Sequence, residues 1–315
     1  MDLATYTALG LDHSLMESDI TQPVNGRTFF EDVTTSNSAE GDAGYEPSPE
    51  AFPGDAVPRG AVEHIPAWPS DTSYPGTTRA VWIYTSPGSR DGADAPALIV
   101  FNDGGMYVDE GGAVRATAVL DSLVHAGELG PVVAVFANPG VPGGAEPGFG
   151  DLDTFRHRSV EYDTCNAAFA SFLETELLPM AEARVGRPFT RDPARRMIAG
   201  ISSGGICAFN TAWHRPDLFG LVLSHCGSFT AIRGGHNYPY LVRSSERKPI
   251  RAFLQSGAAD LDTLFGNWAL ANQAMAAALD YASYEFRFEF GTGGHSLAHA
   301  GACFADAVRW LLPDG

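Results

Sequence analysis

The sequence has little positive charge. Its 315 residues include 20 lysines and arginines against 38 aspartates and glutamates, which gives a formal net charge of -18. Lys248 is the only lysine. A field of this sign repels phosphate backbones and anionic bilayers, so it argues against nucleic acid and membranes as partners. Because the acidic residues are spread along the chain, their simplest role is to keep the protein in solution.

Long apolar segments and paired cysteines are also missing. No run of about 18 apolar residues occurs, so no membrane span is predicted. The first 20 residues include Asp2 and Glu17 and lack the basic start of a secretory leader. Four cysteines are scattered without CxxC spacing, which favours reduced thiols. These are Cys165, Cys207, Cys226 and Cys303. Together the absences predict a cytoplasmic protein.

Residues 1–60 differ in composition from the rest of the chain. They are rich in Ser, Thr, Gly, Pro and acidic residues, and residues 34–60 keep neither a helical nor a strand period. We expect an irregular N-terminal arm that is ordered only where it lies on the main body. Its aromatic residues suggest that it covers the mouth of a site or reaches a neighbouring subunit of a homo-oligomer. They are Tyr6, Phe29, Phe30, Tyr45 and Phe52.

From residue 61 to 315 strand-like runs alternate with helical patterns. The runs 61–68 and 79–85 predict antiparallel edge strands, and the later strands are nearly continuously apolar. Such alternation is typical of an α/β fold with a mostly parallel sheet covered by helices on both faces. Further strands are predicted at 97–102, 131–138, 196–199, 221–224, 251–255 and 284–290, and helices at 112–126, 164–183, 205–214, 267–281 and a last one ending near Leu312. In such sheets chemistry occurs at the carboxyl ends of the strands.

The strongest chemical signal is the segment 200–205, Gly-Ile-Ser-Ser-Gly-Gly. It follows a short apolar strand and opens a helix, which is the setting of a nucleophile elbow. Ser202 has glycine two residues before and after it, where a side chain would collide with neighbouring backbone, whereas Ser203 has Ile201 behind it. We predict Ser202 as the nucleophile and the N–H of Ser203, at the helix start, as an oxyanion donor. The alternative is a Gly/Ser-rich turn without catalytic meaning.

The general base is expected in the loop after the last strand. His295 ends the segment 291–295, Gly-Thr-Gly-Gly-His, whose glycines let the imidazole reach back to Ser202. His299 and His236 compete, but His299 is expected one helical turn further on. His295 and His299 also have the i, i+4 spacing of metal ligands; without a third ligand or an HExxH glutamate, no metal site is predicted.

The acid that orients the base is expected between the serine and the histidine. Asp260 is the first acid after the small-residue turn that follows the strand 251–255, and it is the candidate we prefer. Asp262 competes with it, although it is also suited to cap the next helix. The order Ser, Asp, His is the order of the triad in α/β-hydrolases.

A second oxyanion donor is expected after an early strand. The predicted strand 97–102 runs into Asp103, Gly104 and Gly105, and Gly105 can present its N–H beside that of Ser203. The alternative is a simple Gly-Gly turn. Asp103 is expected to support this turn and not to act as a second acid.

The same segments resemble the esterase branch of the α/β-hydrolases, which includes enterochelin esterases, feruloyl esterases and the esterase D group. The resemblance covers about residues 60–313 and rests on 103–105, 200–205 and 293–295. It implies the α/β-hydrolase fold and ester hydrolysis, with Gly104 of the matched turn as a substrate-binding candidate. The segment 158–162, Arg-Ser-Val-Glu-Tyr, is similar to a motif that flanks the active site of enterochelin-esterase-like members.

By that similarity Arg158 is a second substrate-binding candidate, and the alternative is a salt bridge to Glu161 or Asp163. Siderophore esterases need a basic pocket, and this acidic chain offers little beyond Arg158, Arg233 and Arg243. A neutral carboxylic ester or lactone, cleaved through an acyl-enzyme without a cofactor, is therefore the expected substrate. An acyltransferase, a thioesterase and a catalytically silent binding protein remain as alternatives.

Overall fold

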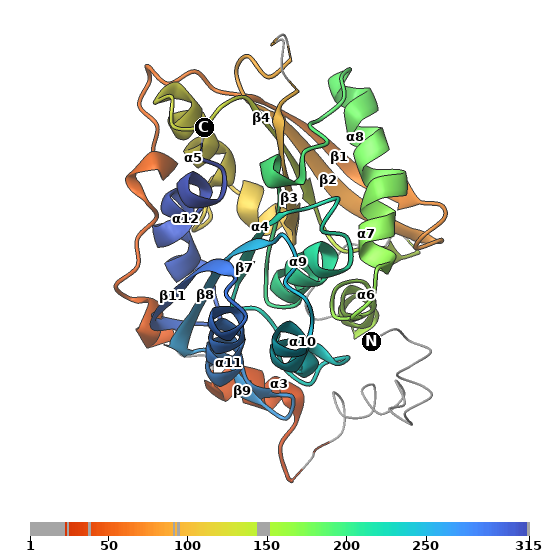
Figure 1. Ribbon diagram of the computed structural model, residues 1–315, viewed down its shortest axis with the longest axis vertical. Coiled ribbons are helices and arrows are strands. Elements are labelled where there is room, and N and C mark those ends of the chain that lie inside the picture. The colour runs from red at the N-terminus through yellow and green to blue at the C-terminus, as the bar shows by residue number, and fades with distance from the viewer. Residues whose placement is uncertain are drawn as a thin grey trace.

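The centre of the computed structural model is a nine-stranded sheet in the order β1-β2-β4-β3-β6-β7-β8-β11, with β5 beside β2 (Figure 1). The structure describes residues 23, 25–36, 39–90, 92, 95–143 and 152–313. The strands of this sheet are β1 (Ala61–Ser70), β2 (Thr77–Thr85), β3 (Ala97–Asn102), β4 (Val132–Ala137), β5 (Val141–Pro142), β6 (Arg196–Ile201), β7 (Leu221–His225), β8 (Arg251–Ala259) and β11 (Glu285–Gly294). A separate two-stranded sheet contains β9 (Asp262–Thr263) and β10 (Gly266–Asn267).

The sheet is antiparallel at one edge and parallel elsewhere. Strand β1 pairs antiparallel with β2, and β2 pairs antiparallel with β4. From β4 onward each neighbour is parallel, through β3, β6, β7 and β8 to β11. Every residue of β3, β4, β6 and β7 is buried, as expected for strands that helices cover on both faces. The predicted mostly parallel α/β fold with two antiparallel edge strands is confirmed.

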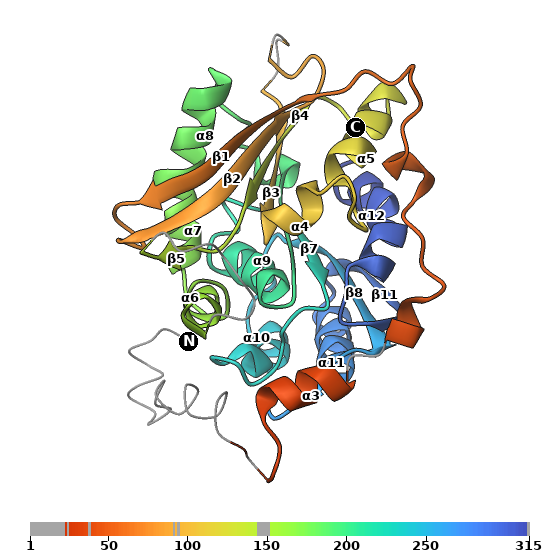
Figure 2. The same ribbon diagram turned by 180° about the vertical axis from the view of Figure 1, so that it is seen from behind.

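Helices cover both faces of the sheet (Figure 2), and alternate residues of its central strands belong to two different core clusters. One core cluster joins Leu98 and Val100 of β3 to α7, α8, α9, α10 and α11, and the other joins Ile99 and Phe101 to α4, α5 and α12. The helices of the main body are α4 (Gly104–Val108), α5 (Ala116–His125), α6 (Leu152–Tyr162), α7 (Ala168–Phe172), α8 (Leu178–Val185), α9 (Ser203–His214), α10 (Tyr238–Ser244), α11 (Trp268–Tyr281) and α12 (Ala298–Leu311). Short 3₁₀ turns are η4 (Pro193–Arg195) and η5 (Gly235–Asn237).

Some helices differ from the sequence prediction. Helix α5 begins at Ala116 and not near 112, because Arg115 takes a left-handed conformation with φ 52°. The predicted helix 164–183 is divided into α7, a π-helical turn η3 (Leu173–Leu177) and α8. Helices α6 and α10 were not expected. Helix α10 has only 7 residues with a proline in its first turn, too short to give a helical period.

The described part of the N-terminal arm lies along the main body. It contains one helix, α3 (Phe29–Ser36), and two 3₁₀ turns, η1 (Ala39–Asp42) and η2 (Pro49–Ala51). Phe29 is buried against Phe155 and Phe265, with ring centroids 5.7 and 5.3 Å away. Of the other arm aromatics, Phe52 is 57% exposed, while Tyr6 and the side chain of Phe30 lie outside the description.

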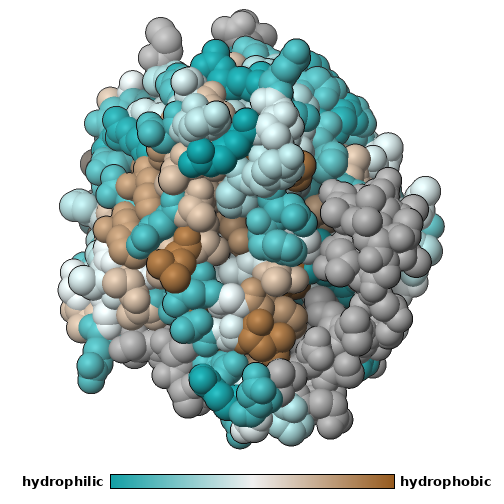
Figure 3. All heavy atoms as spheres, turned by 60° about the horizontal axis from the view of Figure 1, so that its bottom comes forward, coloured by the Kyte–Doolittle hydropathy of each residue, from teal (hydrophilic) through white to brown (hydrophobic). Residues whose placement is uncertain are grey.

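The end of the molecule that carries α3, α10 and α11 has a mixed surface. In Figure 3 hydrophobic residues form small patches among hydrophilic ones on this face. Leu270 of α11 and Tyr240 of α10 are 63% and 70% exposed, which is ordinary for single apolar residues of a protein surface. Within the described ranges, no helix has both the length and the apolar character needed to cross a bilayer.

Candidate active site

Ser202 lies on a strained turn between β6 and α9. Its φ and ψ are 60° and -122°, a conformation that few residues with a side chain adopt. Its N–H donates to the carbonyl of His225 (2.9 Å), and its carbonyl accepts from the N–H of Ser228 (3.1 Å). A Cβ at Gly200 would be 2.3 Å from the carbonyl oxygen of Gly204, so the turn needs glycine there. A strained residue between a strand and a helix, with glycine two positions before it, is the geometry that a nucleophile elbow requires.

The hydroxyl of Ser202 has a polar neighbour that the sequence did not suggest. The Oγ atoms of Ser202 and Ser228 are 3.3 Å apart, and the indole N–H of Trp268 donates to Ser228 Oγ (3.2 Å). The Trp268 ring also meets the His295 ring edge to face, with centroids 5.9 Å apart. Ser228 follows the carboxyl end of β7, which is the one sequence signal that could have indicated it.

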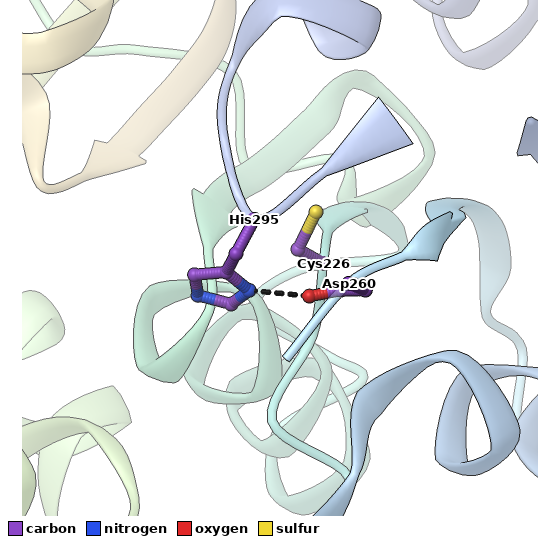
Figure 4. Close-up of side chains that lie close together, drawn as sticks. All are labelled: Cys226, Asp260 and His295. Carbon is purple, nitrogen blue, oxygen red and sulfur yellow. Dashed lines mark hydrogen bonds and ion pairs between the residues drawn. The ribbon is translucent and has the colours of Figure 1, made fainter. Parts of the chain in front are cut away.

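Asp260 and His295 form a close pair (Figure 4). His295 Nδ1 is 2.6 Å from Asp260 Oδ1, and the Asp260 side chain is fully buried. The same carboxylate accepts the hydroxyl of Ser256 at Oδ2 (2.7 Å) and the N–H of Leu261 at Oδ1 (2.8 Å). A carboxylate bound this way keeps the proton on Nδ1, so Nε2 is the nitrogen able to accept another proton.

The competing residues lie in other surroundings. Asp262 is exposed in β9. His299, in the first turn of α12, is buried; its Nδ1 is 3.1 Å from Gln255 Nε2, and its ring stacks on Tyr45. Burial lowers the pKa of His299. His236 is exposed in η5. The structure therefore brings His295 together with Asp260 and gives His299 other partners.

Cys226 lies beside the Asp260–His295 pair (Figure 4). One ligand-type atom from each of the three residues lies within 4.8 Å of the others, a spacing that a metal ion could use. However, burial and the nearby Asp260 carboxylate raise the pKa of the Cys226 thiol well above its ordinary value. A neutral thiol is a poor metal ligand, and Asp260 already binds His295. The trio therefore fits an acid–base pair with a thiol packed beside it.

The predicted oxyanion turn lies at the start of α4. Asp103 is left-handed (φ 52°), and Gly104 packs against β4, where a Cβ would be 2.4 Å from the N atom of Ala137. The N–H of Gly105 donates to the side-chain oxygen of Asn138 (2.9 Å). In this state the Gly105 donor already has an acceptor. Gly104 has no side chain, so it can contact a substrate only through its backbone.

Arg158 is buried beneath this turn. Its Nε and Nη2 donate to Asp103 Oδ1 and Oδ2 at 2.8 and 2.7 Å. The sequence suggested a salt bridge to Glu161 or Asp163; the salt bridge that the structure shows is to Asp103, and Glu161 binds Arg79 at 2.8 and 3.0 Å. Burial raises the pKa of the Asp163 carboxyl to about 6, although Arg158 and the hydroxyls of two serines lower it. The ion pair gives Asp103 the role of supporting the turn, as the sequence suggested.

Comparisons with known proteins find similar esterases. The family model described as "Putative esterase" matches residues 72–311. The iron(III) enterobactin esterase of Dickeya dadantii (strain 3937) is 29% identical over 257 residues, which are 74% of this chain and 52% of the relative. This chain therefore spans about half the length of the curated relative. The matched family residues begin after the N-terminal arm.

Solved structures show the same architecture. The enterobactin esterase of Shigella flexneri, determined in the presence of enterobactin, has 26% identity and a TM-score of 0.64, over 84% of this chain and 61% of that one. A ferulic acid esterase of Anaeromyces mucronatus has 15% identity and a TM-score of 0.63, over 84% of this chain and 95% of that one. The second likeness shows the fold alone. The sheet and helices described above are those of esterases of the α/β-hydrolase type.

Proposed function

This chain belongs to the "Putative esterase" family, and we propose that it hydrolyses a carboxylic ester or lactone with Ser202, His295 and Asp260 as its triad. The observation that carries the proposal is the 2.6 Å bond between Asp260 and His295, in a chain whose Ser202 occupies a nucleophile elbow. The family model confirms the resemblance to esterases that the sequence suggested. The roles of the three residues are the part we propose.

The chemistry follows from the protonation of the imidazole. With Nδ1–H bound to Asp260, Nε2 of His295 takes the Ser202 proton as Oγ attacks the ester carbonyl. The imidazolium then gives that proton to the leaving alcohol, and an acyl-enzyme remains on Ser202. Water, deprotonated by the same nitrogen, releases the acid. Buried Asp260 favours each step in which His295 is charged.

Two backbone donors are proposed for the oxyanion. The N–H of Ser203 opens α9, where the helix dipole favours negative charge. The N–H of Gly105 serves as the second donor if the oxyanion replaces Asn138 as its acceptor. Each such donor contributes roughly 3 kcal/mol to transition-state stabilisation in comparable sites. The exchange adds to the barrier the free energy of the Asn138 bond, which is about 1 kcal/mol for an ordinary hydrogen bond.

The arginines near the site favour an uncharged substrate. The two similar esterases named above have enterobactin in their names, and the iron(III) complex of a catecholate is an anion. Of the arginines that the sequence offers for an anion, Arg158 is bound to Asp103, Arg233 donates to the Ser159 hydroxyl and Arg243 donates to the Ala277 carbonyl, and the net charge is -18. We therefore propose a neutral ester or lactone. Gly104 and Arg158 are kept as candidate substrate-binding residues, the first through its backbone.

The proposal is tested with the purified full chain. It is assayed on p-nitrophenyl esters from acetate to octanoate and, separately, on iron(III) enterobactin. Ser202→Ala is expected to lower kcat by about 10⁴-fold or more. Ser244→Ala, a serine that bonds the Tyr240 carbonyl in α10, is the control and is expected to keep the wild-type rate.

Two results would contradict the proposal in different ways. Full activity of Ser202→Ala would remove Ser202 as the nucleophile. A kcat/KM on iron(III) enterobactin far above that on every neutral ester would refute the substrate class and leave the triad intact.

A further inference from the structure

The turn η1 of the N-terminal arm lies against the end of β11, the strand that runs directly into His295. Asp42 Oδ1 accepts the N–H of Gly294 (2.9 Å), and Asp42 Oδ2 accepts the hydroxyl of Ser296 (2.7 Å). One carboxylate therefore holds the residues immediately before and after His295. Asp42 lies 30 residues before the range 72–311 that the family model matches, so the contact belongs to the arm and not to the matched domain.

Other arm residues extend this contact along the end of β11 and into α12. The hydroxyl of Tyr45 accepts the N–H of Thr292 (3.0 Å), and the Thr292 hydroxyl donates to the carbonyl of Gly41 (3.0 Å). The Tyr45 ring stacks on His299, with centroids 4.1 Å apart and planes 14° apart. The arm thus holds the chain from Thr292 to His299. We call residues 41–45 the arm clamp.

The approach of the two segments is close enough to require glycine in the arm. A Cβ on Gly41 would be 2.2 Å from the carbonyl oxygen of Thr292 and 2.9 Å from Cβ of Ala259. Ala259 directly precedes Asp260, so the clamp contacts the backbone segments that lead into both members of the acid–base pair. The two backbones are therefore packed directly against each other.

The end of β11 has reason to need this support. Gly293 and Gly294 are its last residues, its register with β8 is interrupted between Gly291 and Gly294, and glycine has the largest backbone freedom of any residue. The Asp260 carboxylate holds the ring of His295 through Nδ1, and the backbone before and after His295 sets where that ring begins. A catalytic side chain has to stay within about 0.5 Å of its productive position, and shifts of about 1 Å can cost 10²-fold in rate.

We propose that Asp42 is a positioning residue, and that the arm clamp holds the backbone on both sides of His295 so that its imidazole faces Ser202. This rests on the proposed function of His295. Asp42 does not touch the reacting atoms. Its effect is on the orientation of the base, so it changes the rate of the chemical step and not the affinity for the ester.

The test compares three variants of the full chain. Asp42→Ala removes both contacts, and Asp42→Asn keeps an oxygen for the Gly294 N–H while removing the charge. Glu46→Ala removes an equal charge at an exposed position one residue beyond the clamp and is the control. The readouts are kcat and KM on the best p-nitrophenyl ester and the hydrogen-exchange rate of the Gly294 amide, both measured well below the melting temperature.

We expect kcat of Asp42→Ala to fall by about 10- to 100-fold with KM nearly unchanged. Asp42→Asn should recover most of the loss, and Glu46→Ala should match the wild type. Exchange of the Gly294 amide should quicken in Asp42→Ala only. A kcat of Asp42→Ala equal to that of Glu46→Ala would overturn the proposal, and so would a rise in KM at constant kcat.

Failure of the clamp and failure of the proposed function are distinguishable. If the wild type cleaves no ester and Ser202 takes no fluorophosphonate, the proposed function fails, and His295 has no chemistry to be positioned for. The exchange measurement then still decides whether Asp42 holds the end of β11, because an unchanged Gly294 amide in Asp42→Ala would refute the contact itself.

Discussion

At the scale of single residues, the elbow depends on the absence of side chains around Ser202. A Cβ at Gly200 would meet backbone atoms of Gly204 at 2.3 and 2.4 Å, and backbone cannot move aside cheaply. Gly200→Ala is therefore expected to lower the free energy of unfolding by about 2 kcal/mol and to abolish activity. Gly54→Ala is the control, because a Cβ there meets nothing within 4 Å. Guanidinium unfolding curves of the two variants check this; equal curves would contradict it.

The choice between the two aspartates is a second prediction at this scale. Asp260 is fully buried and binds His295, whereas Asp262 is exposed. Asp260→Asn should lower kcat by about 10⁴-fold, because the amide favours the wrong tautomer of the imidazole. Asp262→Asn should stay within about 2-fold of the wild type. The kcat values of the two variants check this. A larger loss of kcat in Asp262→Asn than in Asp260→Asn would make Asp262 the orienting acid.

Local spacing explains which site residues the sequence could indicate. Ser202 and His295 follow from glycines within two or three positions of them, so short-range pattern was enough to propose them. Ser228, Trp268 and Asp42 were not proposed. Their contacts join residues that are 26, 40 and 252 positions apart in the sequence. A pattern of neighbouring residues cannot indicate contacts over such separations.

At the scale of elements, the strands were the easiest part to predict. Those covered on both faces read as unbroken apolar runs; β3, for example, was expected at 97–102 and spans Ala97–Asn102. Short helices were harder, because α10 and the π-helical turn within 168–185 are defined by tertiary contacts more than by a period. Residues 34–60 showed no persistent period, and the described part of this segment contacts the main body, for example through Tyr45 on His299.

Helix α3 gives a prediction of its own. Phe29 is buried between Phe155 and Phe265, in the cluster that includes Trp268 beside His295. Phe29→Ala should weaken docking of α3 by about 3 kcal/mol, the cost of truncating a buried phenylalanine. Hydrogen exchange over residues 29–36 should then quicken by about 100-fold, since 1.4 kcal/mol is tenfold in an equilibrium constant. Phe52→Ala is the control, because Phe52 is 57% exposed; equal exchange in both variants would contradict the account.

At the scale of the whole molecule, one buried histidine makes stability depend on pH. His225 lies at the end of β7, with Nδ1 2.8 Å from the hydroxyl of Tyr107, and burial lowers its pKa to about 3. Between pH 6.5 and 3 the unfolded chain binds a proton there that the folded chain does not. The contribution of His225 to the free energy of unfolding is therefore fully present above pH 6.5. It is lost as the pH falls, by about 2 kcal/mol at pH 5.

Unfolding at pH 7 and pH 5 checks this effect. His225→Gln keeps a side-chain oxygen for Tyr107 and removes the titrating group, so its stability should fall by about 2 kcal/mol less than that of the wild type between the two pH values. His236→Gln, at an exposed position, is the control. An equal loss in His225→Gln and the wild type would show that other groups cause the acid sensitivity.

The central claim concerns Ser202, and the most direct test is the site of covalent labelling. The full chain is treated with a fluorophosphonate, digested, and its labelled peptide sequenced by mass spectrometry, with Ser202→Ala in parallel. The account predicts one adduct, on Ser202 and not on the adjacent Ser203, which is buried. It also predicts no adduct in Ser202→Ala. An adduct on Ser203 or Ser228, or labelling that survives in Ser202→Ala, would contradict it.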